Sequence, residues 1–144
     1  MQEFWEHYKF LITPFAIWFF IQLFKLIWDL IATRKFNFKR ILGAGGMPSS
    51  HSAVVTGLAT MVGKAAGTDS YVFAMAVIFA VVVMYDAAGV RRAAGKQAKL
   101  LNKIAETPGL TGLEVSEKLV EVLGHTPIQV FVGAIIGIIV GLIV

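Results

Sequence analysis

Four long hydrophobic runs, separated by more polar segments, set the pattern of this chain. Each run is close to the roughly 20 apolar residues with which a helix crosses a bilayer, and their shortness predicts tilt or local thinning of the membrane. The pattern therefore predicts an all-α integral membrane protein. We expect a single domain, residues 1–144, built as a four-transmembrane-helix bundle with spans at about 14–31, 50–66, 71–90 and 128–144.

The connection between the third and fourth runs, residues 91–124, has a helical pattern of its own. Its cations recur at i, i+4, i+7 and i+11 and so form one stripe on a helix: Arg92, Lys96, Lys99 and Lys103. We interpret this stripe as a solvated face, which could also contact lipid headgroups. After a break at Pro108, Thr111 and Glu114 have the spacing of a capping box, which predicts a second helix ending at Gly124. We expect an amphipathic, helical, cytoplasmic connection.

Composition agrees with a membrane protein and removes several classes of function. Hydrophobic residues make up 57% of the chain and charged residues only 15%, and the mean hydropathy is +0.74. The chain has no cysteine, which excludes disulfide and thiolate chemistry. The basic stripe lacks interleaved aromatic residues, so we expect no nucleic-acid partner. No residue cluster has metal-ligand spacing.

The net charge of +4 is concentrated on two connections. One follows the first hydrophobic run and holds Arg34, Lys35, Lys39 and Arg40; the other follows the third run and begins at Arg91. The positive-inside rule places both in the cytoplasm and both termini outside. We therefore expect a multi-pass protein of the cell membrane.

The segment 45–52, Gly-Gly-Met-Pro-Ser-Ser-His-Ser, leads directly into the second run. Glycine allows close backbone approach, and the first turn of a helix offers unpaired N–H groups to an anion. His51 adds a group that can move a proton near neutral pH. The alternative interpretation is a small-residue helix cap in which His51 is merely polar.

The predicted topology brings three distant residues to one membrane surface. His51 opens the second helix, Arg91 follows the third, and His125 precedes the fourth. Histidine and arginine are costly inside or beside membrane helices, which makes these residues candidates for function.

Two segments then carry a family resemblance. Residues 48–51, Pro-Ser-Ser-His, resemble the Pro-Ser-Gly-His motif of the type 2 phosphatidic acid phosphatase superfamily, which also contains vanadium haloperoxidases. Residues 124–130, followed by Gly133 and Ala134, resemble the last motif of that superfamily, where His-x-x-x-Asp leads into a small-residue helix. Together, three segments are similar to its divergent branch of small membrane proteins: 45–53, 85–102 and 123–137.

The resemblance implies roles for the matching residues. His125 aligns with the nucleophile that forms a phosphohistidine, and His51 with the general acid that protonates the leaving oxygen. Arg91 takes the place of the family's arginine. Phosphate oxygens would be held by Ser49, Ser50 and the backbone of the turn that contains Gly46. The family's phosphatases need no metal or other cofactor, although phosphate or vanadate can occupy the site.

The chain departs from the family pattern in three respects, one of which is the spacing of 34 residues from Arg91 to His125, longer than in the family. Gln129 stands where a carboxylate should orient the nucleophilic histidine; it can fix the tautomer of the imidazole but supplies no charge. Asp86 or Glu114 could supply that charge, or Asp86 could pair with a local cation. The family's first motif, a lysine followed by Arg-Pro, is absent. Its nearest substitutes are Lys39 and Arg40. The alternative interpretation is that these two cations only fix the topology by anchoring their loop in the cytoplasm.

The sequence thus predicts a metal-independent membrane phosphatase. Its substrate would be an isoprenoid or glycerolipid phosphate or pyrophosphate, bound among membrane lipids. The alternative is a non-catalytic relative that binds or transports anionic lipid or phosphate, which Lys25 and Asp29 in the first run would support. A ladder of small residues in the last run predicts close helix packing, within the bundle or in a homodimer: Gly133, Gly137 and Gly141.

Overall fold

The computed structural model describes residues 1–34, 46–107, 119–121 and 123–144. Within these ranges the chain forms helices and no strand, so the prediction of an all-α protein is confirmed. The helices are α1 (Gln2–Thr33), α3 (Ser50–Ala66), α4 (Tyr71–Ala88), α5 (Val90–Ala105) and α6 (Pro127–Ile143). Two stretches are long and apolar enough to cross a membrane, α1 and the nearly continuous α4–α5, and α6 is a shorter apolar helix.

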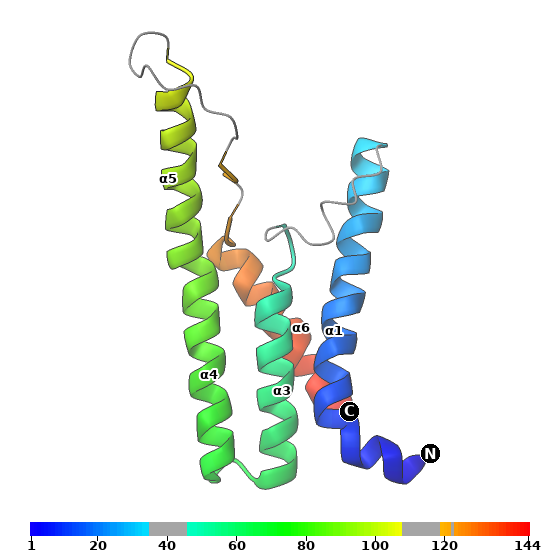
Figure 1. Cartoon of the computed structure of the whole chain (residues 1–144). Helices are drawn as coiled ribbons and strands as arrows, with labels where there is room; N and C mark the ends of the chain where they lie inside the picture. Colours follow the sequence, from blue (N-terminus) through cyan, green and yellow to red (C-terminus); the bar gives the residue numbers. More distant parts are fainter. Residues whose placement is uncertain (35–45, 108–118, 122) are drawn as a thin grey trace.

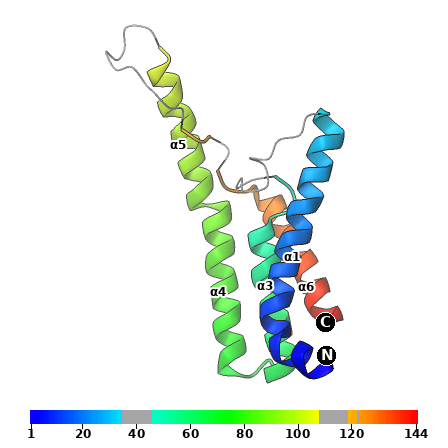
Figure 2. The ribbon, with the colours of Figure 1, turned by 45° about the vertical axis from the view of Figure 1, so that its right-hand side comes forward.

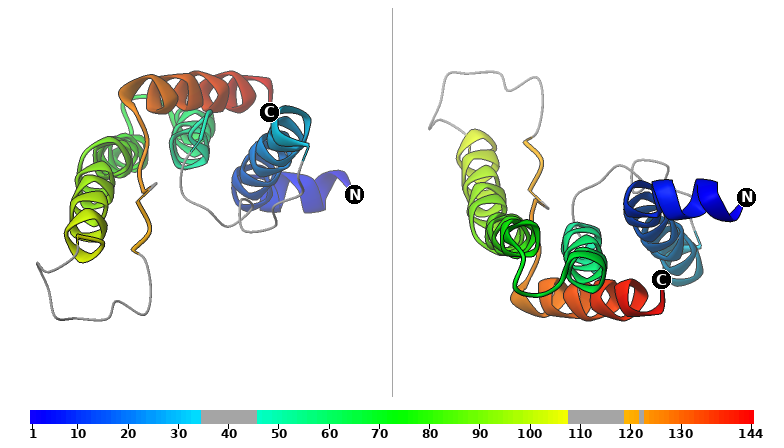
Figure 3. Two further views of the ribbon diagram at one scale, coloured as in Figure 1. Left: turned by 90° about the horizontal axis from the view of Figure 1, so that it is seen from above. Right: turned by 90° about the horizontal axis from the view of Figure 1, so that it is seen from below.

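Helix α3 lies at the centre of the bundle and contacts α1, α4 and α6. Helices α4 and α5 form a tall rod on one side of it and α1 stands on the other (Figures 1 and 2). Helix α6 crosses α3 obliquely, from beside α4 toward α1 (Figure 3). Both termini lie at the end of the molecule that holds the α3–α4 turn. The end of α1, the start of α3 and the whole of α5 lie toward the opposite end.

Two helix boundaries differ from the predicted spans. Helix α1 begins at Gln2 and continues through Pro14, where the first span was expected to start. Its polar first turns are supported by an ion pair between Lys9 and Glu6, and the helix bends in its N-terminal part (Figure 1), as a proline inside a helix causes. Helix α4 ends at Ala88 because Gly89 breaks the rod, and α5 begins at the next residue.

The described residues directly before His125 do not form the predicted helix. Leu119–Glu121 and Leu123 are non-helical, while Thr111 and Glu114 lie outside the described residues. The backbone of Leu119 makes its hydrogen bonds with the buried side chain of Asn102 on α5, in place of those it would make in a helix. Asn102 Nδ2 donates to the Leu119 carbonyl (2.9 Å), and Asn102 Oδ1 accepts from the Leu119 N–H (3.0 Å). Among its described residues, the connection is therefore helical over α5, and Leu119–Glu121 lie back against that helix.

Two glycines allow this close approach. A Cβ at Gly95 on α5 would lie 2.5 Å from the Glu121 carbonyl oxygen. Gly124 has a φ of +87°, and a Cβ there would collide with the backbone of Arg91 and Arg92. Gly124 thus turns the chain against the start of α5 instead of ending a helix.

The glycine ladder of α6 packs against α3 of the same chain. Gly133, Gly137 and Gly141 are buried, and a Cβ at each would collide with a carbonyl oxygen of α3 or of its cap. The contact is reinforced by Thr56, whose Oγ1 donates to the Ala134 carbonyl (3.0 Å). Of the two predicted uses, the structure shows packing within the bundle, because the ladder is covered by α3. The homodimer stays a prediction.

Replacing Gly137 by alanine is expected to destabilise the bundle by about 1–3 kcal/mol, because the added methyl group collides with the backbone carbonyl of Ala53 as well as with the hydroxyl group of Thr56. The control is Ile138→Ala, on the exposed side of α6. The free energy of unfolding of both variants is measured by titrating lipid–detergent micelles with SDS. Equal stability of Gly137→Ala and the parent would contradict the close contact.

Candidate active site

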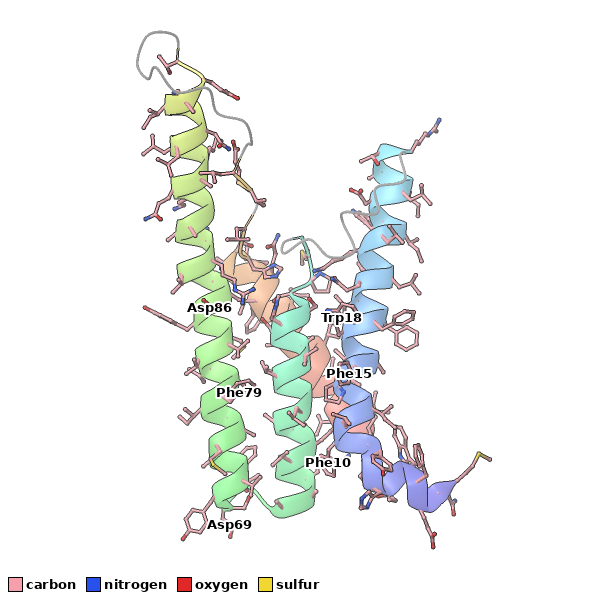
Figure 4. The ribbon with its side chains drawn as sticks, in the orientation of Figure 1. Phe10, Phe15, Trp18, Asp69, Phe79 and Asp86 are labelled. Carbon is pink, nitrogen blue, oxygen red and sulfur yellow. The ribbon has the colours of Figure 1, made fainter. Side chains whose placement is uncertain are left out.

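Four parts of the fold meet where α3 begins. The start of α3 supplies His51, the segment before α6 supplies His125, the α4–α5 junction supplies Arg91, and α1 supplies Lys25. The two imidazole rings are neighbours, with centroids 6.1 Å apart and planes inclined by 60°. Figure 4 shows polar side chains gathered at this level, beside the labelled Asp86. The three residues that the topology predicted to share one surface therefore do so.

The backbone of His125 is held by the break between α4 and α5. Its N–H donates to the Ala87 carbonyl (2.8 Å). In an unbroken helix this carbonyl would accept the N–H of residue 91. At Gly89 the backbone turns away (φ −103°, ψ −84°), which leaves the Ala87 oxygen for His125. The side chain of His125 is buried, with 2% of the residue exposed.

Gln129 fixes the tautomer of His125. Its Oε1 accepts the Thr126 N–H (3.0 Å) as part of the capping box that starts α6. The same oxygen lies 3.3 Å from Nδ1 of His125. Because an acceptor faces Nδ1, the hydrogen-bond network assigns the proton of neutral His125 to Nδ1. The lone pair on Nε2 is then available for attack, so the geometry agrees with the orienting role that the sequence suggested for Gln129.

The surroundings of His125 keep it neutral. Burial lowers the pKa of its imidazole from the usual 6.5, and the positive charge of Lys25 lowers it further. Hydrogen bonding to Gln129 and to the backbone of Gly46 acts in the opposite direction but does not reverse the shift. His125 is thus in its neutral form at pH 7.

The start of α3 is tied to the start of α6. The Ser49 N–H donates to the Gln129 carbonyl (3.0 Å), and Ser49 Oγ accepts from the Ser52 N–H (3.3 Å) as the N-cap of α3. The side chain of Ser49 is fully buried, so its observed contacts are those of a helix cap. The first N–H groups of a helix have no acceptor within it, and those of Ser50 and His51 lie at this end of α3.

His51 is the second residue of α3 and lies among charged groups. Its Nδ1 is buried and makes no hydrogen bond within the described parts of the chain. The charges of Arg91, Lys25 and Asp86 all act on its ring. Asp86 is salt-bridged to Arg91, with 2.6 Å between Oδ2 and Nε. Of the two roles suggested for Asp86, the structure shows the ion pair with a local cation, Arg91. The side chain that contacts His125 is that of Gln129.

Lys25 is a site residue that the sequence did not reveal as one. It is only 8% exposed, and its charge acts on both His51 and His125. Ile17, Ile21 and Lys25 recur every four residues on the buried face of α1. That spacing was the available signal, because it places Lys25 on the stripe that meets α3 and not on the exposed aromatic side of α1.

The other residues that the sequence analysis named are Lys39, Arg40, Gly46 and the cations of the α5 stripe. Lys39 and Arg40 lie outside the described residues, while Gly46 is described, with a φ of +78°. The cations of the α5 stripe are exposed, as a solvated face requires: Arg92, Lys96, Lys99 and Lys103. Among the described residues, no group of three or more His, Cys, Asp or Glu side chains could hold a metal ion.

Comparisons with known proteins agree with the resemblance seen in the sequence. A model of the divergent PAP2 family matches residues 6–140. The chain is 42% identical over 144 aligned residues to the uncharacterized membrane protein YuiD of Bacillus subtilis (strain 168), an alignment that covers 92% of this chain and 91% of that protein. No solved structure matches the chain.

The contact between Gln129 and His125 predicts an ordered series of pKa values. Parent His125 should titrate below pH 6.5, Gln129→Leu should titrate lower still because it removes a hydrogen bond that favours the charged ring, and Gln129→Glu should titrate higher because it adds a negative charge. Gln97→Leu on α5 is the control. The measurement is an NMR titration of the imidazole signals in micelles, and the chain has three histidines, so replacing His7 and His51 assigns the His125 signal. An unchanged pKa in Gln129→Leu would contradict the contact.

Proposed function

We propose, since this chain belongs to the divergent PAP2 family, that it is a metal-independent membrane phosphatase. It hydrolyses a lipid-type phosphate or pyrophosphate through a phosphohistidine. The observation that carries this proposal is the buried His125, whose Nδ1 faces Gln129 and whose ring lies 6.1 Å from that of His51. One neutral histidine with a free Nε2 and a second histidine nearby are the groups that a two-step phosphoryl transfer requires.

In the first step Nε2 of His125 attacks phosphorus, and the bond to the lipid oxygen breaks. His51 gives a proton to that oxygen, which leaves as the alcohol or, from a pyrophosphate, as the lipid monophosphate. In the second step His51 takes a proton from a water molecule that attacks the phosphohistidine. Inorganic phosphate leaves, and both imidazoles return to their starting forms.

The cations and the helix terminus around the two rings would bind the phosphoryl oxygens. Phosphoryl transfer depends on positioning and on neutralising the charge of these oxygens. Arg91 uses Nε for Asp86, and its remaining guanidinium N–H groups are outside that bond. Lys25 supplies a second positive charge from α1. The N–H groups of Ser50 and His51 add the positive end of the α3 dipole, while Ser49 caps the helix that presents them.

The membrane arrangement is part of the proposal. Helices α3 and α6 have 17 residues each, about 25 Å of helix, so with α1 and α4 they make four tilted spans of the cell membrane. The termini lie at the end away from the site, whereas the end of α1, which Arg34 caps, and helix α5, which carries the basic stripe, lie toward the site end (Figure 1). The positive-inside rule then gives a cytoplasmic active-site face and external termini.

A non-catalytic role in binding lipid phosphate is the second candidate. It is favoured by Gln129, which holds the Nδ1 proton of His125 but cannot stabilise a positively charged imidazole by charge. The pairing of Arg91 with Asp86 also reduces the net charge offered to phosphate. In this case the same residues would bind a lipid phosphate and release it unchanged.

Removal of either site histidine is expected to lower phosphate release by at least about a hundredfold. The substrates are radiolabelled polyprenyl and diacylglycerol phosphates presented in lipid, and His7→Ala is the control because His7 lies on the exposed N-terminal part of α1. A labelled phosphohistidine should be trapped in the parent but not in His125→Ala. His51→Ala should lose less activity on p-nitrophenyl phosphate, whose leaving group needs little protonation.

These measurements separate the two candidate functions. Full activity in both variants would exclude the proposed roles of His51 and His125. Tight binding of lipid phosphate by a parent protein that releases no phosphate would favour the non-catalytic role.

Lys25 is expected to contribute through its charge. Lys25→Met should lower kcat/KM by at least about tenfold and Lys25→Arg should recover part of the loss, because a neutral side chain no longer attracts the phosphoryl oxygens. Lys64→Met is the control, since Lys64 donates to the Leu142 carbonyl near the opposite end of the bundle. The assay is phosphate release at varied substrate concentration. Parent-like kinetics for Lys25→Met would remove Lys25 from the site.

A further inference from the structure

A long apolar groove of about 730 Å³ separates α1 from α6. Helices α1 and α6 both pack on α3, and the space between them is left open on the side away from α3. Its walls are hydrophobic side chains except for one threonine, Thr13. The walls include Ala16, Phe20 and Phe24 of α1 and Val132, Ile136 and Val140 of α6.

Helix α6 builds its wall with a stripe that is offset by one residue from the glycine ladder. The glycines at 133, 137 and 141 face α3, whereas Val132, Ile136, Val140 and Val144 line the groove. The four-residue spacing of both stripes keeps them parallel along the helix. The same contact that brings α6 close to α3 therefore turns a row of branched side chains toward α1.

One end of the groove meets the site. Met47 and Pro48 are part of its wall, and they directly precede Ser49, the cap of the helix that carries His51. On α1, the lining residues Phe24 and Trp28 flank Lys25 in the sequence. A phosphate bound beside the histidines would thus have the first carbons of its lipid chain at the mouth of the groove.

The length of the groove distinguishes between kinds of lipid. Its wall on α1 includes Trp5 at the far end and, from Ile12 to Trp28, covers about 24 Å along the helix. The hydrocarbon core of a bilayer is about 30 Å thick, so one leaflet accounts for roughly 15 Å. The groove therefore passes the midplane of the membrane, beyond the depth at which the chains of a two-chain lipid from one leaflet end.

The volume of the groove agrees with a single small ligand as its occupant. A volume of 730 Å³ lies within the about 300–1,000 Å³ typical of sites for a single small ligand.

From these observations we propose that the groove holds one long hydrocarbon chain, and that the substrate is the phosphate or pyrophosphate of a single-chain lipid alcohol of the polyprenol kind. The inference rests on the proposed phosphatase site for the position of the phosphate. It selects among the substrates considered above, because a two-chain glycerolipid would leave the far half of the groove unfilled.

The three tryptophans of the chain allow a binding test that needs no catalysis. Trp28 lines the site end of the groove and Trp5 the far end, whereas Trp18 lies on another face of α1. Variants that keep one tryptophan each, with phenylalanine at the other two positions, are placed in phosphatidylcholine vesicles. They are titrated with polyprenyl phosphate that carries bromine, a fluorescence quencher, either near the phosphate or near the end of the chain.

Bromine near the phosphate should quench Trp28 at a mole fraction at least severalfold lower than it quenches Trp18. Bromine near the chain end should instead quench Trp5 preferentially. Equal quenching of the three tryptophans would overturn the groove as a binding site. Equally strong preferential quenching by brominated phosphatidic acid would overturn the preference for a single chain.

A second measurement links the groove to turnover. Ala16→Phe fills the middle of the groove, and Leu23→Phe adds the same bulk on the face of α1 near Trp18. We expect Ala16→Phe to lower by at least tenfold the ratio of kcat/KM for a long polyprenyl phosphate to that for a five-carbon prenyl phosphate. Leu23→Phe should keep the ratio of the parent.

The outcomes separate the groove from the chemistry. Hydrolysis of both substrates with an unchanged ratio in Ala16→Phe would overturn the groove and leave the phosphatase standing. Preferential quenching of Trp28 and Trp5 by a protein that releases no phosphate would support the groove and overturn the phosphatase.

Discussion

The hydrogen bond from the His125 N–H to the Ala87 carbonyl joins the two halves of the site. It exists because Gly89 interrupts the helical rod and leaves a carbonyl without its usual partner. A buried backbone N–H requires an acceptor, so the break and the position of His125 depend on each other. Gly124 then has to turn against the first residues of α5, where no side chain fits. The geometry of the catalytic candidate is thus determined by backbone contacts.

The contact between α3 and α6 determines the position of His51, in the second half of the site, in the same way. Glycines on α6 admit the backbone of α3, and the Ser49 N–H bonds to the Gln129 carbonyl at the end of this contact. Gln129 consequently serves both helices: its backbone holds the cap of α3, and its side chain caps α6 and faces His125. A single residue connects the placement of His51 with the tautomer of His125.

The sequence allowed the helical class and the proximity of His51, Arg91 and His125 to be predicted, because hydrophobic runs and the order of helices they imply are local properties. Lys25 was missed, since its role depends on which face of α1 meets α3. The non-helical segment at Leu119 was wrongly predicted as helix, since its hydrogen-bond partner, the distant side chain of Asn102, is not visible in the local pattern. The contacts of Ser49 could not be predicted from the sequence either. Its hydroxyl group could bind a phosphate or cap a helix, and only the packing of the folded chain shows that it caps α3.

The break at Gly89 also has a consequence for depth. Apolar α4 ends at this residue and α5, with its exposed lysines, begins. In the proposed membrane arrangement the rod therefore passes from lipid to water at the level where the Ala87 carbonyl holds His125. The proposed hydrolysis of a lipid phosphate needs an anchored hydrocarbon chain and a supply of water at the same phosphorus atom. In that reaction the position of one glycine along a helical rod would determine where the lipid chain and the water meet.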